Sequence, residues 1–307
     1  MEQFFTMLQV QMQMAAYFFL GYLLSKKNII SRESRRSITD LVLTITLPCT
    51  IFISFQQTVS VEQIRSLFWS FLAGLGLMIF SWLLCQILYR KRPAAKQPTL
   101  KFGTLISNYT FAGLPVAEAV YGSIGLMHAA IFSIPMRICN WTVGLSLFTQ
   151  NKGSQRGDQI KNALLNPCFM AVIIGLLWML ASLPLPAMVG NFMSSLGSCT
   201  TPLSMMIVGT VLADVPLREV WDKDVLYLTG VRLILLPALT LLCLRLLGFD
   251  PIGESVAVVL AAMPVASLTV MFSEKYGADA QFASKCVVFS TLLSLITVPL
   301  FVLLMQL

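Results

Sequence analysis

The chain has 307 residues, of which 57% are hydrophobic and only 11% are charged. A soluble globular protein carries about 25% charged residues, so this composition excludes a cytosolic enzyme, a nucleic-acid-binding module and a disordered chain. Apolar runs of about 20 residues recur along the sequence, and each is long enough to cross the hydrocarbon core of a bilayer as a helix. We therefore predict an all-α polytopic membrane protein.

Ten segments have the length of a membrane span, near residues 3–24, 37–55, 66–89, 101–122, 125–148, 163–183, 188–212, 225–247, 254–275 and 281–305. The first has neither a basic run before it nor a small-residue cleavage site after it, which favours a span over a removed signal peptide. The connectors are short, the longest lying near 150–163, and no phosphate-binding loop of the type G-x-x-x-x-G-K-[ST] occurs. We expect neither a soluble domain nor direct use of ATP.

The positive charges are distributed unevenly between the two sides of the predicted membrane. The loops after spans 1, 3, 5, 7 and 9 hold 17 of the 21 Lys and Arg residues. By the positive-inside rule these loops are cytoplasmic, so both termini are predicted outside a cell membrane of the bacterial inner-membrane type. This topology accounts for the net charge of +7 with no nucleic-acid partner, although membrane lipids remain a possible partner class. The seven cysteines lack C-x-x-C spacing, and we predict no metal and no cofactor.

Prolines interrupt four of the apolar segments at matching places. Pro48 and Pro115 lie 67 residues apart in spans 2 and 4, and Pro202 and Pro264 lie 62 residues apart in spans 7 and 9. We infer two five-span halves, 1–150 and 151–307. Because each half has an odd number of spans, the second enters the membrane inverted, as in many secondary transporters. For Pro48 and Pro202 a simple helix kink is the alternative.

The substrate site is predicted where polar and small residues cluster around Pro115 and Pro264. A broken helix frees backbone N–H and C=O groups that lipid cannot satisfy, so they must face protein or a watery cavity, where they can bind a solute. Glu118 and Ser267 each lie three residues after their proline, at matching places in the two halves. The predicted substrate-binding residues of these two spans are Asn108, Tyr109, Thr110, Gly113, Leu114, Pro115, Met263, Pro264 and Ser267.

Four segments together resemble the auxin efflux carrier family, which includes plant auxin exporters and bacterial permeases for malate, malonate and related acids. SNYTFAGLP (107–115) is similar to the family's span-4 signature, and LLNPCFMAVIIGLLWML (164–180) resembles the Asn-Pro opening of its span 6. AAMPVASLTVMFSEKYGADA (261–280) is similar to its span 9, and STLLSLITVPLFVLL (290–304) to its last span. The segments occur in the family's order, and the resemblance covers the whole chain.

The resemblance implies ten helices in two inverted five-helix repeats, with spans 4 and 9 unwound and crossing at their prolines. It also implies a scaffold of spans 1, 2, 6 and 7, which commonly forms a homodimer contact, and a transport part of spans 3–5 and 8–10. In the family a small organic anion sits beside the crossover, the Asn matching Asn108 helps to hold its carboxylate, and related structures move by an elevator-like shift.

The chain departs from the plant exporters in span 3, where SLFWSFLAGLGLMIFSWLLCQ (66–86) has no charge in place of their Asp–Lys type pair. The large cytoplasmic loop of the longer plant proteins is also missing. Auxin itself is therefore not expected as the substrate.

Three ionisable residues stand out within the predicted spans, where a charge is unfavourable unless it is paired or hydrated: Glu118 in span 4, Arg137 in span 5 and Arg232 in span 8. One hypothesis is that Arg137, with Asn140 one turn on, or else Arg232, completes an anion site with Asn108, because a guanidinium matches a carboxylate. The alternative is that Arg137 pairs with Glu118. Glu118 or Arg232 is also a candidate for proton or ion coupling, and a hydrated Glu118 near the outer face is the simpler reading.

The function predicted from the sequence is secondary active transport of a small mono- or dicarboxylate by alternating access. One alternative is a sodium-coupled organic-anion symporter, similar to the bile-acid symporters. Another is a membrane sensor that binds a ligand without moving it. An enzyme is not predicted, because no paired intramembrane aspartates and no Ser–His pair stand out in the sequence.

Overall fold

The computed structural model describes residues 2–56, 60–149, 165, 167–181, 183–213 and 222–305, and all regular elements in these ranges are helices. Five segments are long and apolar enough to cross a membrane: Glu33–Ser54, Glu62–Leu88, Tyr109–Phe148, Lys223–Leu246 and Ala280–Met305. Pro167–Leu180 and Pro251–Ala261 are shorter apolar helices. An all-helical protein with several membrane spans is confirmed, whereas the count of ten spans stays a prediction.

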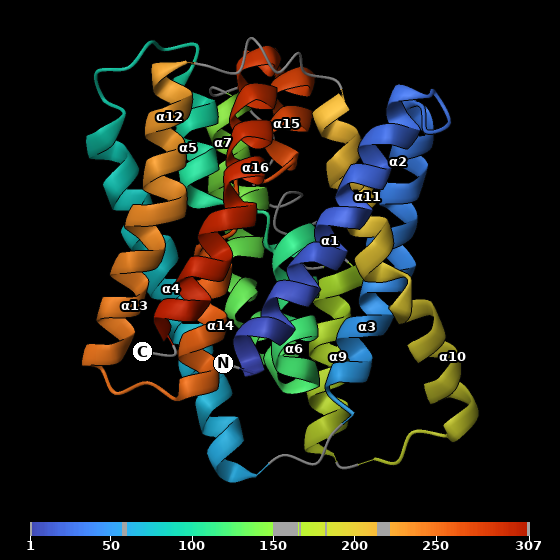
Figure 1. Cartoon of the computed structure of the whole chain (residues 1–307). Coiled ribbons are helices and arrows are strands. Elements are labelled where there is room, and N and C mark those ends of the chain that lie inside the picture. Colours follow the sequence, from blue (N-terminus) through green and yellow to red (C-terminus); the bar gives the residue numbers. More distant parts are fainter. Residues whose placement is uncertain are drawn as a thin grey trace.

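Both ends of the chain lie at the same end of the helical bundle (Figure 1). The first half contains α1 (Glu2–Lys26), α2 (Arg32–Leu41), η1 (Val42–Thr46), α3 (Leu47–Ser54), α4 (Val61–Leu88), α5 (Gln97–Leu105), η2 (Tyr109–Gly113), α6 (Leu114–Cys139), η3 (Asn140–Gly144) and α7 (Leu145–Thr149). The second contains α9 (Pro167–Leu180), α10 (Ala187–Ser198), α11 (Thr200–Ala213), α12 (Lys223–Gly230), η5 (Val231–Leu235), α13 (Leu236–Leu246), α14 (Pro251–Ala261), α15 (Leu268–Tyr276) and α16 (Ala280–Met305).

Two of the predicted spans are broken helices. In the segment 101–122, α5 ends at Leu105 and helical structure resumes at Tyr109. In the segment 254–275, α14 ends at Ala261 and α15 begins at Leu268. The interruptions fall at Asn108 and Pro264, where the sequence places its polar and small residues.

The chain folds back on itself at Gly122, inside α6. Gly122 has φ 66° and ψ −160°, a left-handed conformation that glycine adopts without a steric penalty. The segments before and after this turn run side by side, as the distance of 5.4 Å between the ring centroids of Phe102 and Phe148 shows. Nearer the turn, the guanidinium carbon of Arg137 lies 5.8 Å from the centroid of the Tyr109 ring. Tyr109–Phe148 is therefore a helical hairpin.

Three prolines follow wide π-helical turns. The turns η1, η2 and η5 each end two residues before a proline, at Pro48, Pro115 and Pro237 respectively. Proline has no N–H, and its ring clashes with the carbonyl four residues earlier; a π-turn widens the helix at that place. The helix thus continues through Pro48, as the kink alternative predicts, while Pro202 lies in the first turn of α11 after an interruption at Cys199.

The helices pack in two groups (Figure 1). The α1/α11 group consists of α1, α3, α9, α10 and α11, and the crossover group of α4, α5, α6 and α12 to α16. α1 and α11 approach each other at two glycines, since an added Cβ on Gly21 would overlap with the Met206 carbonyl oxygen, and one on Gly209 with that of Phe18. Small residues of this kind allow close packing of membrane helices.

Candidate functional site

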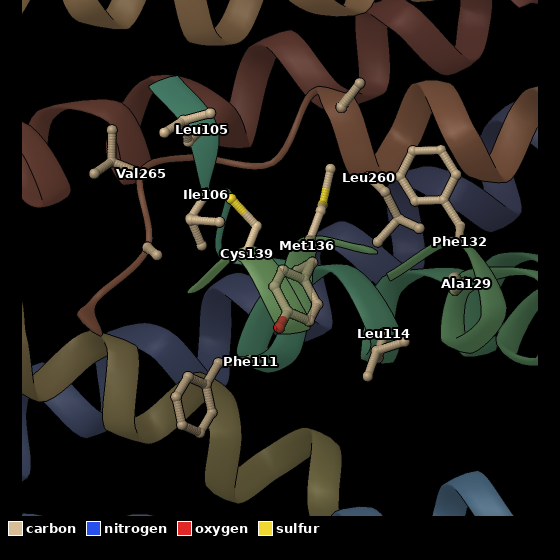
Figure 2. Packing of buried hydrophobic residues seen from close by; sticks show 14 of the residues in the cluster. Leu105, Ile106, Phe111, Leu114, Ala129, Phe132, Met136, Cys139, Leu260 and Val265 are labelled. Atoms are coloured by element: carbon tan, nitrogen blue, oxygen red, sulfur yellow. The ribbon is translucent and has the colours of Figure 1, made fainter. Parts of the chain in front are cut away.

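The two broken helices meet at their interruptions and are joined through the main chain. The N–H of Asn108 donates a 2.7 Å hydrogen bond to the carbonyl oxygen of Pro264, and Ser107 pairs with Val265 in an antiparallel bridge. The N–H of Val265 in turn donates to Ser290 Oγ on α16 at 3.1 Å. Apolar side chains pack around this crossover, among them Leu105, Ile106, Met136, Cys139, Leu260 and Val265 (Figure 2).

Arg232, on η5, binds the ends of both broken helices. Its Nε donates to the Met263 carbonyl oxygen just beyond α14 at 3.0 Å, and its Nη1 donates to the Thr104 carbonyl oxygen in the last turn of α5 at 2.9 Å. The side chain is fully buried. Each helix C-terminus carries about half a negative charge, so the guanidinium offsets both ends at once.

A small cavity of about 40 Å³ lies beside the crossover. A water molecule needs roughly 10–15 Å³ of such space, so the cavity has room for about three. Its walls come from both helix groups, with α1 and α11 on one side and the crossover, α6 and α16 on the other. The lining residues are Met14, Phe18, Asn108, Ala112, Val116, Met205, Val208, Met263, Pro264, Thr291, Ser294, Leu295 and Val298.

The crossover offers hydrogen-bond donors and positive potential to this cavity. η2, which continues into α6, and α15 both begin there, and neither Asn108 nor Ser267 caps its helix with its side chain. A helix start leaves four N–H groups without an intrahelical partner and carries about half a positive charge. The Asn108 Nδ2 is buried and has no partner among the described residues. Such an arrangement suits an anion.

Three of the predicted binding residues, Asn108, Met263 and Pro264, line the cavity. The other crossover candidates do not form its walls. Gly113, for example, packs against Leu260 and Met263. Six residues therefore stay predicted substrate contacts: Tyr109, Thr110, Gly113, Leu114, Pro115 and Ser267.

The predicted charged residues lie in three separate places. Arg137 is buried beside the Tyr109 ring and the Cys168 thiol of α9, and Asn140 is buried one turn further on. Glu118 is four residues before the turn at Gly122, whereas Arg137 is fifteen after it. With a rise of 1.5 Å per residue, the two lie roughly 16 Å apart along the hairpin, so the structure does not bring them together as a pair. Neither of them lines the cavity, and nor does Arg232.

The cavity also contains residues that the sequence reasoning missed. Thr291 and Ser294 of α16 provide the hydroxyl groups among the lining residues, and the Thr291 Oγ1 is buried without a partner among the described residues. Their spacing of three residues places them on one helix face, a signal present in the segment 290–304. Met14, Phe18, Met205 and Val208 form the opposite wall, and no local pattern distinguishes them from other apolar residues of α1 and α11.

A cavity between two groups of membrane helices, at a crossover of broken helices with buried polar groups, is typical of a membrane transport protein. Residues 7–302 match the membrane transport protein family, that of the auxin efflux carriers, and the chain belongs to this family.

Three relatives cover nearly the whole chain. An uncharacterized transporter of Methanothermobacter thermautotrophicus is 26% identical and is aligned over 92% of both chains. A Rhizobium meliloti protein provisionally named a malonate transporter is 23% identical over 91% of this chain and 90% of its own. An uncharacterized transporter of Methanocaldococcus jannaschii is 23% identical over 92% of this chain and 93% of its own. The family and these relatives are transporters, not enzymes.

Proposed function

We propose that this protein is a secondary carrier of a small organic anion, with its substrate site at the crossover. The observation that carries the proposal is the cavity lined by Asn108, whose buried amide nitrogen has no partner among the described residues. An unpaired buried donor is unfavourable, and a carboxylate in the cavity would satisfy it. The name of the Rhizobium meliloti relative supports an organic acid as the substrate class.

Alternating access is supported by the position of the cavity between the two helix groups. The cavity of about 40 Å³ is bounded by both groups, so a separation of the groups would widen it for the substrate. We propose that the crossover group is the transport part, that the α1/α11 group is the scaffold and dimer contact, and that the motion is elevator-like. The halves 1–150 and 151–307 are then inverted repeats, with both termini outside the cell membrane.

Coupling to an ion is part of the proposal, with Glu118 as the proton carrier. It is partly buried on α6, where a carboxylate is favoured only if hydrated or protonated. A sodium site is the alternative, since the buried hydroxyls of Ser107, Ser267 and Thr291 have no partner in the described part of the chain. Proton coupling is supported if a pH gradient drives accumulation of the substrate and Glu118→Gln loses this accumulation. Sodium coupling is supported if uptake of the substrate requires sodium.

The function is tested by uptake of labelled dicarboxylates (malate, malonate and oxalate) and monocarboxylates (2-oxobutyrate and 4-methyl-2-oxopentanoate) into proteoliposomes, with and without pH and sodium gradients. We expect saturable uptake of at least one of these acids, with an affinity that falls at least about tenfold in Asn108→Ala. Ser81→Ala is the matched control, because the Ser81 hydroxyl is also buried and has no partner in the described part of the chain, but lies on α4 and does not line the cavity. Saturable uptake with unchanged affinity in Asn108→Ala would reject the site, and no saturable uptake of any of these organic anions would reject the carrier function.

The same assay tests the hypothesis that Arg137 completes the anion site. Arg137 lies outside the cavity wall, so the geometry favours retained substrate affinity in Arg137→Ala. Loss of affinity as large as that in Asn108→Ala would show that Arg137 reaches the substrate when the helix groups move.

A further inference from the structure

The cavity beside the crossover has two chemically different walls. The crossover side carries Asn108, the Pro264 backbone, Thr291 and Ser294. The opposite side consists of thioether, aromatic and aliphatic side chains from α1 and α11: Met14, Phe18, Met205 and Val208. A substrate that fills such a space has one polar end and one apolar end.

The positive charge available to the cavity amounts to about one unit. None of the described lining residues is ionisable. Arg137 lies outside the cavity wall, and Arg232 donates to the carbonyl oxygens of Thr104 and Met263, where it offsets the negative ends of α5 and α14. The starts of η2 and α15 then remain, each with about half a positive charge. Together they balance one carboxylate but not two.

We infer that the substrate is a short monocarboxylate with an apolar tail, and that the cavity discriminates against dicarboxylates. This inference rests on the proposed carrier function and names its substrate class. The carboxylate lies against the Asn108 amide, the first N–H groups of η2 and the Thr291 hydroxyl. The tail lies against Met14, Phe18 and Met205. A second carboxylate would face this apolar wall, where an unpaired charge is strongly unfavourable.

The test compares pairs of acids that differ by one charge at nearly equal size. Purified protein is offered malonate or monomethyl malonate, and succinate or monomethyl succinate, together with 2-oxobutyrate and 4-methyl-2-oxopentanoate. Binding is measured as ligand-dependent thermal stabilisation, and transport as counterflow in proteoliposomes at pH 7.5. We expect each monoester to bind at least about tenfold more tightly than its diacid, a difference of 1.4 kcal/mol.

The pH dependence provides a second, independent reading. As the pH falls through the second ionisation of malonate, the monoanion forms and malonate binding rises. Binding of monomethyl malonate stays level over the same range. A preference for the diacids at pH 7.5 would overturn the inference and leave the carrier function intact. Binding of neither acid nor ester, with no counterflow, would overturn both.

A charge introduced into the apolar wall gives the reverse experiment. Met205→Lys places a cation opposite Asn108, and we expect it to shift the ratio of monoester to diacid affinity at least about tenfold toward the diacid. Met188→Lys on α10 is the matched control, since Met188 is 86% exposed and does not line the cavity. An unchanged ratio in a folded Met205→Lys protein would place the tail elsewhere. If this variant does not fold, the wild-type comparison still decides the inference.

Discussion

The main-chain N–H of Asn108 donates a 2.7 Å hydrogen bond to the carbonyl oxygen of Pro264. The two broken helices are thus joined by atoms that every substitution at position 108 retains, other than proline. The Asn108 side chain takes no part in this bond, and its amide nitrogen has no partner among the described residues. Binding and stability can therefore be separated at this residue.

Asn108→Ala is expected to weaken substrate binding while leaving the fold intact. A hydrogen bond to a charged group contributes about 1.5–3 kcal/mol, so the affinity should fall by roughly 10- to 150-fold. Removing an unpartnered buried amide should change the free energy of unfolding by less than about 1 kcal/mol, with either sign. Ligand titration and thermal unfolding in detergent measure the two effects. A large loss of stability with unchanged affinity would show that the amide is structural.

Arg232→Met is expected to destabilise the crossover. The variant loses two charge-assisted hydrogen bonds and leaves the Thr104 and Met263 carbonyl oxygens without their donor, which should cost about 3–5 kcal/mol. Arg232→Lys keeps the charge but not the two-pronged geometry, so we expect an intermediate loss. Unfolding temperatures measured without substrate give the ranking. If Arg232→Met is as stable as wild type and loses only ion coupling, Arg232 serves coupling and not the helix ends.

Gly209→Ala should separate α1 from α11 and disturb the apolar wall of the cavity. The added Cβ meets the Phe18 carbonyl oxygen, and main-chain atoms cannot move aside as a flexible side chain can. We expect the free energy of unfolding to fall by about 1–3 kcal/mol, and we expect a similar effect for Gly21→Ala. Gly76→Ala on α4 is the control, because nothing lies within 4 Å of its added Cβ. At Gly76, helix propensity alone predicts that the free energy of unfolding rises by up to about 1 kcal/mol. Equal unfolding temperatures for Gly209→Ala and Gly76→Ala would contradict this close packing.

An ion pair between Lys96 and Asp222, which both lie outside the membrane-spanning segments, should make stability depend on pH. Lys96 Nζ lies 2.8 Å from Asp222 Oδ2 and 3.0 Å from Asp224 Oδ2. Partial burial by itself would raise the pKa of Asp222, but hydrogen bonds from Lys96 and the Asp224 N–H outweigh it and hold the pKa below its usual 3.8. Burial would likewise lower the pKa of Lys96, but both carboxylates hold it above 10.5.

The signs of these shifts define the pH window. A depressed carboxyl pKa stabilises the fold above pH 3.8, and this contribution is lost as the pH falls through the folded value. A raised lysine pKa stabilises below pH 10.5, and this is lost as the pH rises through the folded value. Between about pH 5 and 9 we expect a level contribution of about 1 kcal/mol, absent in Lys96→Met and retained in Lys91→Met. Identical pH profiles for both variants would reject the assignment.

Much of the fold could be predicted from the sequence, because lipid imposes a strong length and composition rule on helices. The interruptions near Pro115 and Pro264 could also be located, since proline and its polar neighbours mark them. The π-helical turns before Pro48 and Pro237 could not, because a proline in a helix permits several local solutions. The division of the segment 188–212 into α10 and α11 at Cys199 could be located in part, because Pro202 marks it and lies in the first turn of α11.

The candidate site was predictable in part for a similar reason. Asn108 stands out as a polar residue beside a helix break, but Met14 and Met205 look like any other apolar residue until α1 and α11 are placed against the crossover. The sequence predicts Arg232 as a charge within a membrane span, but it does not predict its partners, which are the backbone carbonyl groups of Thr104 and Met263. The types of side chain in a sequence do not indicate which backbone carbonyl groups at a helix end lack a hydrogen-bond donor.

The bond from Arg232 to the Thr104 carbonyl oxygen joins groups 128 residues apart, and this separation constrains the order of assembly. While the first half of the chain enters the membrane, the end of α5 has no donor, and the N–H of Asn108 still lacks Pro264. At about 5–20 residues per second, translation needs roughly 6 to 26 s to supply Arg232. Until then the unsatisfied backbone must be sheltered by the insertion machinery or by water, and a chain truncated before Arg232 is expected to be a target for membrane quality control.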